Sequence, residues 1–512
     1  RWDVQAATSG AIGEGIRGRI AARLLKQDAG IDNVGGPAEA GGVRDELGVR
    51  GSLDFDLALS VELLLRAHYE QDTGVNPSPL NSALALGDHQ ISVGADGVQD
   101  TDNRFYGASA EATAQWGAWA ITSLTAVEGF EQDYGFDFDG QPAAIANLSY
   151  DRKYLQLSQE LFGRTSWDGG DVLLGVSLAA DTFKQDYLIW CGVLNTSTLV
   201  GSCQYPGAAA RVGPTPASSA PAVSLLTNMK QTRDVGALYT LVDFDINPAV
   251  TLTVGGRYTV EQIDGQGYGL HIYSDGVRAL NNRSGVGLAR GKNTIDEGRF
   301  TGTAAAKWRL SPNAMAYVSY GGGYKSGGFN GEVANNATHY QDEGLFSAET
   351  VDSYEIGFKG DMGDALTFEA AMFQQDYSDP QARIFVAFPL PGGGFITSNS
   401  LANLDAATVQ GAELSALWRP LDGFEIGGSV TALDTEIEQG ADASGAANAA
   451  TFNGKPLPFA SDLSATLHAR QEWTLSGDMR LSLEAAAKYQ SEYFLDAEGR
   501  NDRRQGPVTL ID

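Results

Sequence analysis

The feature that most constrains this chain is a period-two alternation of apolar and polar residues, repeated in pairs around short turns. In "GRFTGTAAAKWRL-SPN-AMAYVSYGGGY", Phe300, Trp308 and Leu310 fall on one face, and Thr301 and Lys307 fall on the other. Successive side chains of a strand point to opposite faces, so this segment is predicted to be a two-faced β-hairpin. A helix would instead repeat its apolar residues every three to four positions.

The same pattern recurs along the chain. "SYEIGFKG-DMGD-ALTFEAAMF", "VQGAELSALW-RPLDG-FEIGGSVTA" and "DLSATLHARQEW-TLSGD-MRLSLEAAAKY" alternate in the same way, and similar pairs begin near residues 47, 155 and 236. The expected short turns are 54–56, 116–118, 164–170, 243–249, 310–313, 361–364, 419–423 and 475–478. The expected long polar connections are 27–41, 70–104, 132–150, 185–231, 263–296, 326–348, 378–402, 438–459 and 491–506.

A soluble sandwich has no reason to place every short turn at one end and every long loop at the other. An outer-membrane barrel does, because short periplasmic turns and long extracellular loops join tilted strands of about ten residues. The sequence therefore predicts an all-β fold, an antiparallel transmembrane β-barrel of roughly eighteen complete strands. Trp308, Tyr320 and Trp418 are expected in the interfacial aromatic girdles.

Composition excludes other classes. The formal net charge of -29 and the pI near 4.4 argue against nucleic acid as a partner, because phosphate binding needs an excess of Lys and Arg. The densest apolar window, "LALSVELLLRA", is interrupted by Glu62 and is too short for a membrane helix.

The polar face carries the residues that could act in catalysis, ligand binding or metal binding. The carboxylates Glu355, Glu369, Glu413 and Glu425 lie at regular lumen-facing positions, where hydrogen bonding within the wall explains them better than acid–base catalysis. Three lumen-facing cations, Arg257, Lys359 and Arg470, either guide an anionic ligand or neutralise wall carboxylates. His468 is inward and solitary, so a lumen-lining role is favoured over metal ligation. The sequence predicts no catalytic, cofactor-binding or metal-binding residues and gives no means to select the ligand-binding ones.

The glycine-rich stretch "GGGYKSGGFNGE" (321–332) resembles a phosphate-binding loop only superficially. Such a loop needs Gly directly before Lys and a helix after it, but Tyr324 precedes Lys325 and more glycine follows Ser326. We expect the stretch at the barrel rim, where glycine permits tight curvature and positive φ, with Lys325 as a solvated charge.

The two cysteines, Cys191 and Cys203, have a spacing that fits a small loop disulfide, which would imply an oxidising compartment. Two unpaired thiols remain the alternative.

Several longer sequence segments resemble a known family. "AYVSYGGGYKSGGFN", "FSAETVDSYEIGFKGDM", "AAMFQQDYSDPQ", "NLDAATVQGAELSALWRPLDGFEIGGSVTALDTEI" and "FNGKPLPFAS" resemble the C-terminal half of TonB-dependent outer-membrane receptors of Gram-negative bacteria, of the siderophore-receptor type. "WAITSLTAVEGFEQDYGFDFDG" and "LTVGGRYTVE" resemble the middle of the same barrel.

The resemblance implies a barrel of about 22 strands, plugged by an N-terminal domain and energised from the inner membrane through TonB. In that pattern a plug and a TonB box precede the barrel, and about two and a half more strands follow "GPVTLID". We therefore expect residues 1–512 to be a partial barrel domain without its first and last strands, a fragment whose unpaired edges prevent a stable closed channel by itself.

The leading functional prediction is a monomeric outer-membrane receptor and transporter, not an enzyme, for a scarce bulky ligand such as a ferric siderophore or similar iron chelate. Its implied partners are the TonB complex, outer-membrane lipid and that small molecule. A passive porin is the alternative, and it predicts a loop folded inward to constrict the pore. An outer-membrane enzyme would need a nucleophile and a base that the sequence does not display.

Overall fold

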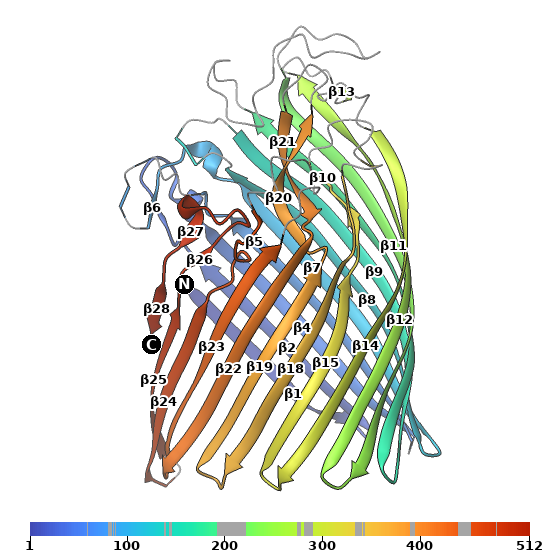
Figure 1. The fold of residues 1–512 in the computed structure, drawn as a ribbon. Coiled ribbons are helices and arrows are strands. Elements are labelled where there is room, and N and C mark those ends of the chain that lie inside the picture. The colour runs from blue at the N-terminus through green and yellow to red at the C-terminus, as the bar shows by residue number, and fades with distance from the viewer. Residues whose placement is uncertain are drawn as a thin grey trace.

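The chain forms one curved, tilted wall of antiparallel strands in a computed structural model (Figure 1). The structure describes all residues except 59, 80–83, 85, 88, 138–139, 143–145, 192–221, 274–277, 281–289, 333–339, 341–343, 390–394, 439–451 and 478. No helix in this described part is long and apolar enough to span a membrane.

Each wall strand pairs with the next one in chain order. The wall strands are β1 (Trp2–Gly13), β2 (Ile16–Gln27), β4 (Val43–Ala58), β5 (Val61–Val75), β7 (Asp100–Trp116), β8 (Trp119–Asp137), β9 (Ala146–Trp167), β10 (Gly170–Cys191), β11 (Ala222–Asn247), β12 (Val250–Tyr273), β14 (Arg290–Ser311), β15 (Ala314–Lys325), β18 (Glu349–Met362), β19 (Leu366–Ser378), β22 (Ala406–Leu421), β23 (Phe424–Glu438), β24 (Leu463–Ser476), β25 (Met479–Gln490) and β28 (Val508–Ile511). All of these neighbours are antiparallel. Among the described residues, the wall thus has the roughly eighteen complete strands that were predicted, followed by the short β28.

Small elements decorate the long connections. They are β3 (Asp32–Asn33), β6 (Gln90–Ile91), β13 (Arg278–Leu280), β16 (Gly328–Phe329), β17 (Leu345–Phe346), β20 (Gln381–Pro389), β21 (Phe395–Asn403), β26 (Tyr493–Phe494), β27 (Arg504–Gln505) and the short 3-10 helices η1 (Ala38–Gly41), η2 (Ala95–Gly97) and η6 (Asn501–Arg503). The connection predicted over 378–402 therefore contains a hairpin, β20–β21, which the sequence prediction missed.

Short turns and long connections segregate to opposite ends of the wall, as expected (Figure 1). Seven of the eight predicted turns contain the observed break between strands, or all but one residue of it. The turn predicted at 54–56 is wrong, because β4 continues to Ala58. Asp54 and Asp56 stay in the strand, where Arg17 of the neighbouring β2 donates to their carboxylates at 3.1 and 3.0 Å.

The wall strands other than β28 are longer than the ten residues expected, but the apolar part of the long strand β12 is not. On β12, which has 24 residues, the outward positions are apolar or glycine from Val250 to Val260 and become polar at Gln262. Ten steps of about 3.4 Å, tilted by about 40°, give a height near 26 Å, which matches the apolar band of an outer-membrane barrel. The remaining residues carry the wall beyond the membrane at the long-loop end.

The outward face is the apolar one. Large apolar side chains there are exposed in the isolated chain, including Leu157 at 58%, Ile356 at 61% and Phe300 at 73%. Trp308, Tyr320 and Trp418 are also outward and exposed, consistent with the predicted girdles. We call this surface the apolar belt, and an exposed apolar surface of this extent faces lipid.

Among the described residues, the clusters of buried side chains lie at the long-loop end of the wall. Four small clusters of buried residues form there, and the two that matter below are Leu148, Tyr187, Ile189 and Leu225, and Met229, Ile263, Phe329 and Tyr340. A wide barrel has a wet interior, so clusters of buried side chains form where a connection folds back on the wall.

Candidate functional site

The connection after β15 folds into the barrel. We call residues 326–348 the inner loop, of which 326–332, 340 and 344–348 are described. Phe329 is 4% exposed and packs on Met229 of β11 and Ile263 of β12, and Gln185 Nε2 of β10 donates to the Gly331 carbonyl at 2.8 Å. These wall residues lie at inward positions, which alternate with the exposed outward ones. The inner loop therefore crosses the inner face of three strands that are not its sequence neighbours.

Glu332, at the end of the glycine-rich stretch, is the focus of the inner loop's polar contacts. Arg383 of β20 donates to its carboxylate through both terminal nitrogens, at 2.7 and 3.0 Å. The Tyr150 hydroxyl of β9 donates to the same carboxylate at 3.2 Å. The bond from Arg383 raises the pKa of its guanidinium. One carboxylate thus joins the inner loop, the β20–β21 hairpin and the distant wall strand β9.

Aromatic rings and an arginine surround this contact. Tyr150 packs against Tyr187 of β10 with ring centroids 5.0 Å apart, and Tyr134 of β8 lies 6.3 Å from Tyr150. The Arg152 guanidinium lies 3.8 Å from the Tyr150 ring centroid and donates to Gln185 Oε1 at 2.7 Å. Burial lowers the pKa of Arg152, whereas burial and the Glu332 charge raise the pKa of Tyr150. We call Tyr134, Tyr150, Arg152 and Tyr187 the aromatic–arginine cluster.

The β20–β21 hairpin holds the other side of the inner loop. Asn330 Nδ2 donates to the Leu401 carbonyl at 2.8 Å, and the Leu401 amide donates back to Asn330 Oδ1 at 2.9 Å. Ser347 and Asn403 make a similar reciprocal pair, at 2.7 and 3.0 Å. The inner loop is therefore fixed on both sides, by the hairpin and by the wall.

The glycines of the stretch serve a different purpose from the one expected. None of the glycines from 321 to 331 has a positive φ, so the prediction of left-handed backbone at this rim is wrong. A Cβ on Gly331 would lie 2.5 Å from Gln185 Nε2, and one on Gly327 would lie 2.7 Å from the Phe346 carbonyl oxygen. Glycine is needed here because neighbouring groups approach the backbone closely.

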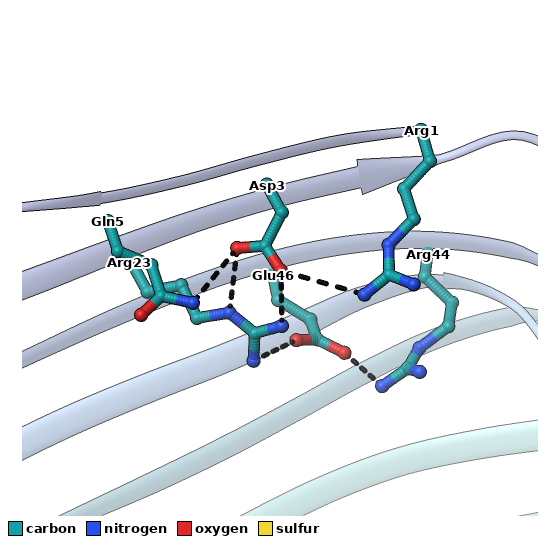
Figure 2. Close-up of polar contacts among 6 residues, drawn as sticks. All are labelled: Arg1, Asp3, Gln5, Arg23, Arg44 and Glu46. Carbon is teal, nitrogen blue, oxygen red and sulfur yellow. Dashed lines mark hydrogen bonds and ion pairs between the residues drawn. The ribbon is translucent and has the colours of Figure 1, made fainter. Parts of the chain in front are cut away.

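A second polar group lies inside the barrel on β1, β2 and β4 (Figure 2). Arg23 donates to the Asp3 carboxylate at 3.0 and 3.1 Å and to Glu46 at 3.4 Å, and Arg44 pairs with the other oxygen of Glu46. Glu46 is only 7% exposed. Farther toward the short turns, a concavity of ≈ 890 Å³ opens along the same inner face, lined in part by Arg19, Arg50, Arg66 and His68.

The predicted lumen-facing charges are mostly paired with each other. Lys359 binds Glu369 at 3.2 Å, and Arg470 binds Glu484 at 3.2 Å, so both neutralise wall carboxylates. Glu425 likewise pairs with Arg419 at 3.2 Å. These ion pairs are contacts of the kind predicted for residues that line the wall.

Four other predicted lumen residues make contacts of other kinds. Glu355 accepts from the Tyr317 hydroxyl at 2.5 Å. Arg257 donates to Thr259 Oγ1 at 3.1 Å, and its guanidinium lies 5.3 Å from the Tyr239 ring centroid. His468 packs over Gly427 on the neighbouring strand, where a Cβ would lie 2.4 Å from its ring. Glu413 sits opposite Ala371 and Thr431, between β19 and β23.

Two predictions concern residues at the long-loop rim. Lys325 is exposed at the end of β15, as expected of a solvated charge. Cys203 and the side chain of Cys191 lie outside the described residues, so the predicted disulfide stays a prediction. Within the described part of the chain, no three His, Cys, Asp or Glu side chains gather in a way that could hold a metal ion.

Sequence reasoning missed Tyr150, Arg152, Glu332 and Arg383 as a group. A signal was available in "SYDRKY", where Tyr150, Arg152 and Tyr154 alternate on the inward face beyond the apolar belt. A guanidinium among tyrosine rings can bind anionic and aromatic groups by charge and stacking.

Comparisons with known proteins agree with this architecture. A family model described as TonB dependent receptor-like, beta-barrel matches residues 68–512. Among solved structures, the ferric yersiniabactin uptake receptor FyuA from Yersinia pestis has a TM-score of 0.76 and 17% sequence identity, covering 100% of this chain and 69% of that chain.

Two further solved structures have the same fold. The siderophore receptor PiuA from Acinetobacter baumannii has a TM-score of 0.71 at 16% identity, covering 99% of this chain and 72% of that chain. The ferric-catecholate import receptor Fiu from K12 E. coli has a TM-score of 0.64 at 16% identity, covering 100% of this chain and 72% of that chain. At these identities the likeness shows a shared fold.

Proposed function

Because this chain belongs to the TonB-dependent receptor β-barrel family of the Gram-negative outer membrane, we propose that it takes up a scarce, bulky anionic ligand. The proposed ligand class is a ferric siderophore or a similar iron chelate, and the proposed energy source is the TonB complex. Residues 1–512 then act as barrel domain, and the receptor works as a monomer in outer-membrane lipid. The solved structures with this fold include uptake receptors for ferric chelates, which supports the choice of ligand class.

The aromatic–arginine cluster carries this proposal. It lies inside the barrel at the long-loop end, where a ligand captured by the loops would enter. Arg383 already neutralises Glu332, whereas the polar contacts of Arg152 are with the neutral Gln132 and Gln185. Arg152 therefore adds positive charge beside tyrosine rings, and this combination suits an anionic ligand with planar groups.

The test is ligand binding by the purified protein and its Arg152→Gln variant. A panel of ferric chelates is titrated while intrinsic tryptophan fluorescence is followed. Loss of one charge-assisted contact, at about 1.5–3 kcal/mol, predicts binding about 10- to 150-fold weaker for the variant. Arg419→Gln, which removes an ion-paired arginine beside a short turn, is the matched control. If no ferric chelate binds the wild-type protein, the proposed ligand class is wrong.

A passive pore is the second candidate, because the inner loop is folded into the barrel as a porin constriction would be. The two functions differ in their energy requirement. Uptake that stops when the inner-membrane TonB complex is deleted supports the energised receptor. Uptake that continues in that strain, together with steady conductance in planar bilayers, supports the passive pore.

A further inference from the structure

Four lysines form one row across the outward face of five neighbouring strands. Lys153 of β9 is directly opposite Lys184 of β10, and Lys184 is directly opposite Lys230 of β11. The row continues through Gln266 of β12 to Lys292 of β14. The chain has ten lysines in all, and four of them lie in this lysine row, which spans about 19 Å at a strand spacing near 4.8 Å.

This arrangement is costly for the protein alone. Residues directly opposite each other on antiparallel strands have Cα atoms about 4.5–5.5 Å apart, and like charges there destabilise the sheet. Within the described part of the chain, none of these four ammonium groups lies within 4.0 Å of a carboxylate oxygen, whereas Lys26 has such a partner in Asp45, at 2.8 Å. An external anion would relieve the repulsion.

The row stands at the upper edge of the apolar belt. On β9 the outward positions run Leu157, Leu155, Lys153, so the first lysine follows the last apolar residue directly. On β10 the outward positions run Ala180, Thr182, Lys184, so one threonine lies between the last apolar residue and the lysine. Because rows of paired residues run across tilted strands, each later lysine stands higher above the belt. Anions bound along the row would therefore lie at several heights above the hydrocarbon.

A groove opens directly below the row, on the outward face of the same strands. It measures ≈ 930 Å³ and is lined by residues that include Leu157, Leu178, Gly236, Tyr258, Val260 and Gly298. Glycine at the two outward positions leaves room that larger side chains fill elsewhere in the belt. A smaller hollow of ≈ 450 Å³ lies between Lys230 and Lys292. An apolar groove under a cationic row has the shape and polarity of an anionic lipid.

We propose that this outward surface binds a phosphorylated glycolipid of the outer leaflet, the lipid A part of lipopolysaccharide. An acyl chain lies in the groove, and phosphates lie on Lys153, Lys184 and Lys230. A glycolipid with phosphates at different depths fits a climbing row better than a phospholipid with a single phosphate. This site is separate from the proposed ligand path inside the barrel.

Carboxylates near the lysine row repel phosphate, so their positions decide which part of the row binds the phosphate nearest the membrane. Asp234 and Asp296 line the upper edge of the groove on β11 and β14, and Asp264 accepts from the Thr294 hydroxyl at 2.5 Å. On β9 and β10, no carboxylate stands between the groove and the lysines. The phosphate nearest the membrane therefore belongs between Lys153 and Lys184. Asp151 and Asp186 stand one outward step above them, and Asn228 donates to Asp186 at 2.6 Å.

The experiment measures lipid binding by the delipidated protein in detergent, from the rise in its unfolding temperature with added lipid. The probes are bisphosphorylated lipid A, the same lipid A after enzymatic dephosphorylation, and phosphatidylglycerol. A cation near a lipid surface contributes about 1 kcal/mol, so the combined variant Lys153→Gln/Lys184→Gln/Lys230→Gln should bind bisphosphorylated lipid A about 100-fold more weakly. The variant Lys26→Gln/Lys325→Gln/Lys488→Gln has the same charge change elsewhere and should stay within about twofold of wild type.

Two measurements keep the proposal testable if the combined variant does not fold. Dephosphorylated lipid A should bind the wild-type protein about 100-fold more weakly than the bisphosphorylated form. Gly236→Leu tests the groove without changing charge, since a Cβ there meets only Leu178 at 3.5 Å and Val260 at 3.7 Å. It should fold normally and bind lipid A about tenfold more weakly.

Three outcomes would overturn the proposal. Equal binding by the two lysine variants would show that the row is not the site. Equal binding of phosphatidylglycerol and bisphosphorylated lipid A would assign the surface to anionic lipids in general. Unchanged binding of lipid A by Gly236→Leu would show that no acyl chain lies in the groove.

Discussion

Replacing Glu332 with alanine should release the inner loop from the barrel wall. The change leaves Arg383 without its carboxylate and leaves the Tyr150 hydroxyl, half-buried among aromatic rings, without its acceptor. Hydrogen bonds to charged groups contribute about 1.5–3 kcal/mol each. The Arg383 side chain is 55% exposed, so solvent screening places its pair with Glu332 at the low end, about 1.5 kcal/mol. With about 1 kcal/mol for Tyr150, the total is about 2–3 kcal/mol, or about 30- to 150-fold in the equilibrium for loop opening.

Hydrogen–deuterium exchange of the inner loop measures this opening. The Leu401 amide donates to Asn330 Oδ1 at 2.9 Å and the Ser347 amide donates to Asn403 Oδ1 at 2.7 Å, so both are protected only while the inner loop is docked against the β20–β21 hairpin. In Glu332→Ala they should exchange about 30- to 150-fold faster, while the paired amides of β10–β12 keep their wild-type rates.

Glu369→Ala is the matched control, because it breaks a lumen-facing ion pair with Lys359 on strands outside this contact. It should leave exchange in the inner loop unchanged. A change of less than about threefold in Glu332→Ala would refute the reasoning, because the contacts of Glu332 would then add almost nothing to docking. Faster exchange throughout β10–β12 would instead show that the inner loop supports the whole wall.

Three further predictions concern the belt, the glycines and the tyrosines. Ile356→Arg puts a charge on the lipid-facing surface and should lower the free energy of unfolding in lipid vesicles by about 2–4 kcal/mol. Ile356→Leu is the control. An unchanged urea midpoint for Ile356→Arg would contradict the assignment of this face to lipid. Gly267→Ala places a Cβ 2.2 Å from the Tyr340 hydroxyl of the inner loop and 2.2 Å from the Asn228 carbonyl oxygen that this hydroxyl binds. It should make the inner loop more sensitive to proteolysis, whereas Gly321→Ala, with nothing within 4 Å of its Cβ, should not. Equal sensitivity of the two variants would contradict the packing argument. Tyr150 should ionise only above its ordinary pKa of about 10, so its contribution to stability is complete below that pH and is lost as pH rises through the higher folded-state pKa. The difference in tyrosinate absorbance between wild type and Tyr150→Phe measures this, and ionisation at or below pH 10 would contradict it.

The barrel wall was predictable because its signal is local. Outward residues such as Phe300, Trp308 and Leu310 alternate with inward ones over single strands, and each pair is joined by a short turn, so neighbouring residues alone reveal the fold. The wrong turn at 54–56 had a local cause as well, since "DFD" resembles a turn by composition. Arg17, on a strand 37 residues earlier, holds Asp54 in β4 instead.

The candidate site was not predictable in the same way. The Tyr150 and Glu332 side chains are 182 residues apart in sequence, and they meet only because the wall curves and the inner loop crosses its inner face. The role of the glycines before Glu332 was missed for the same reason, since their close neighbours come from β10, β11 and β17.

The sequence by itself thus determined which residues face lipid and which face the lumen, because a strand's pleat assigns each side chain to one face without reference to the rest of the chain. Tertiary structure decided which lumen residues touch and which outward lysines share a row. Both depend on the register and curvature of strands that are distant in sequence, and no local pattern encodes them.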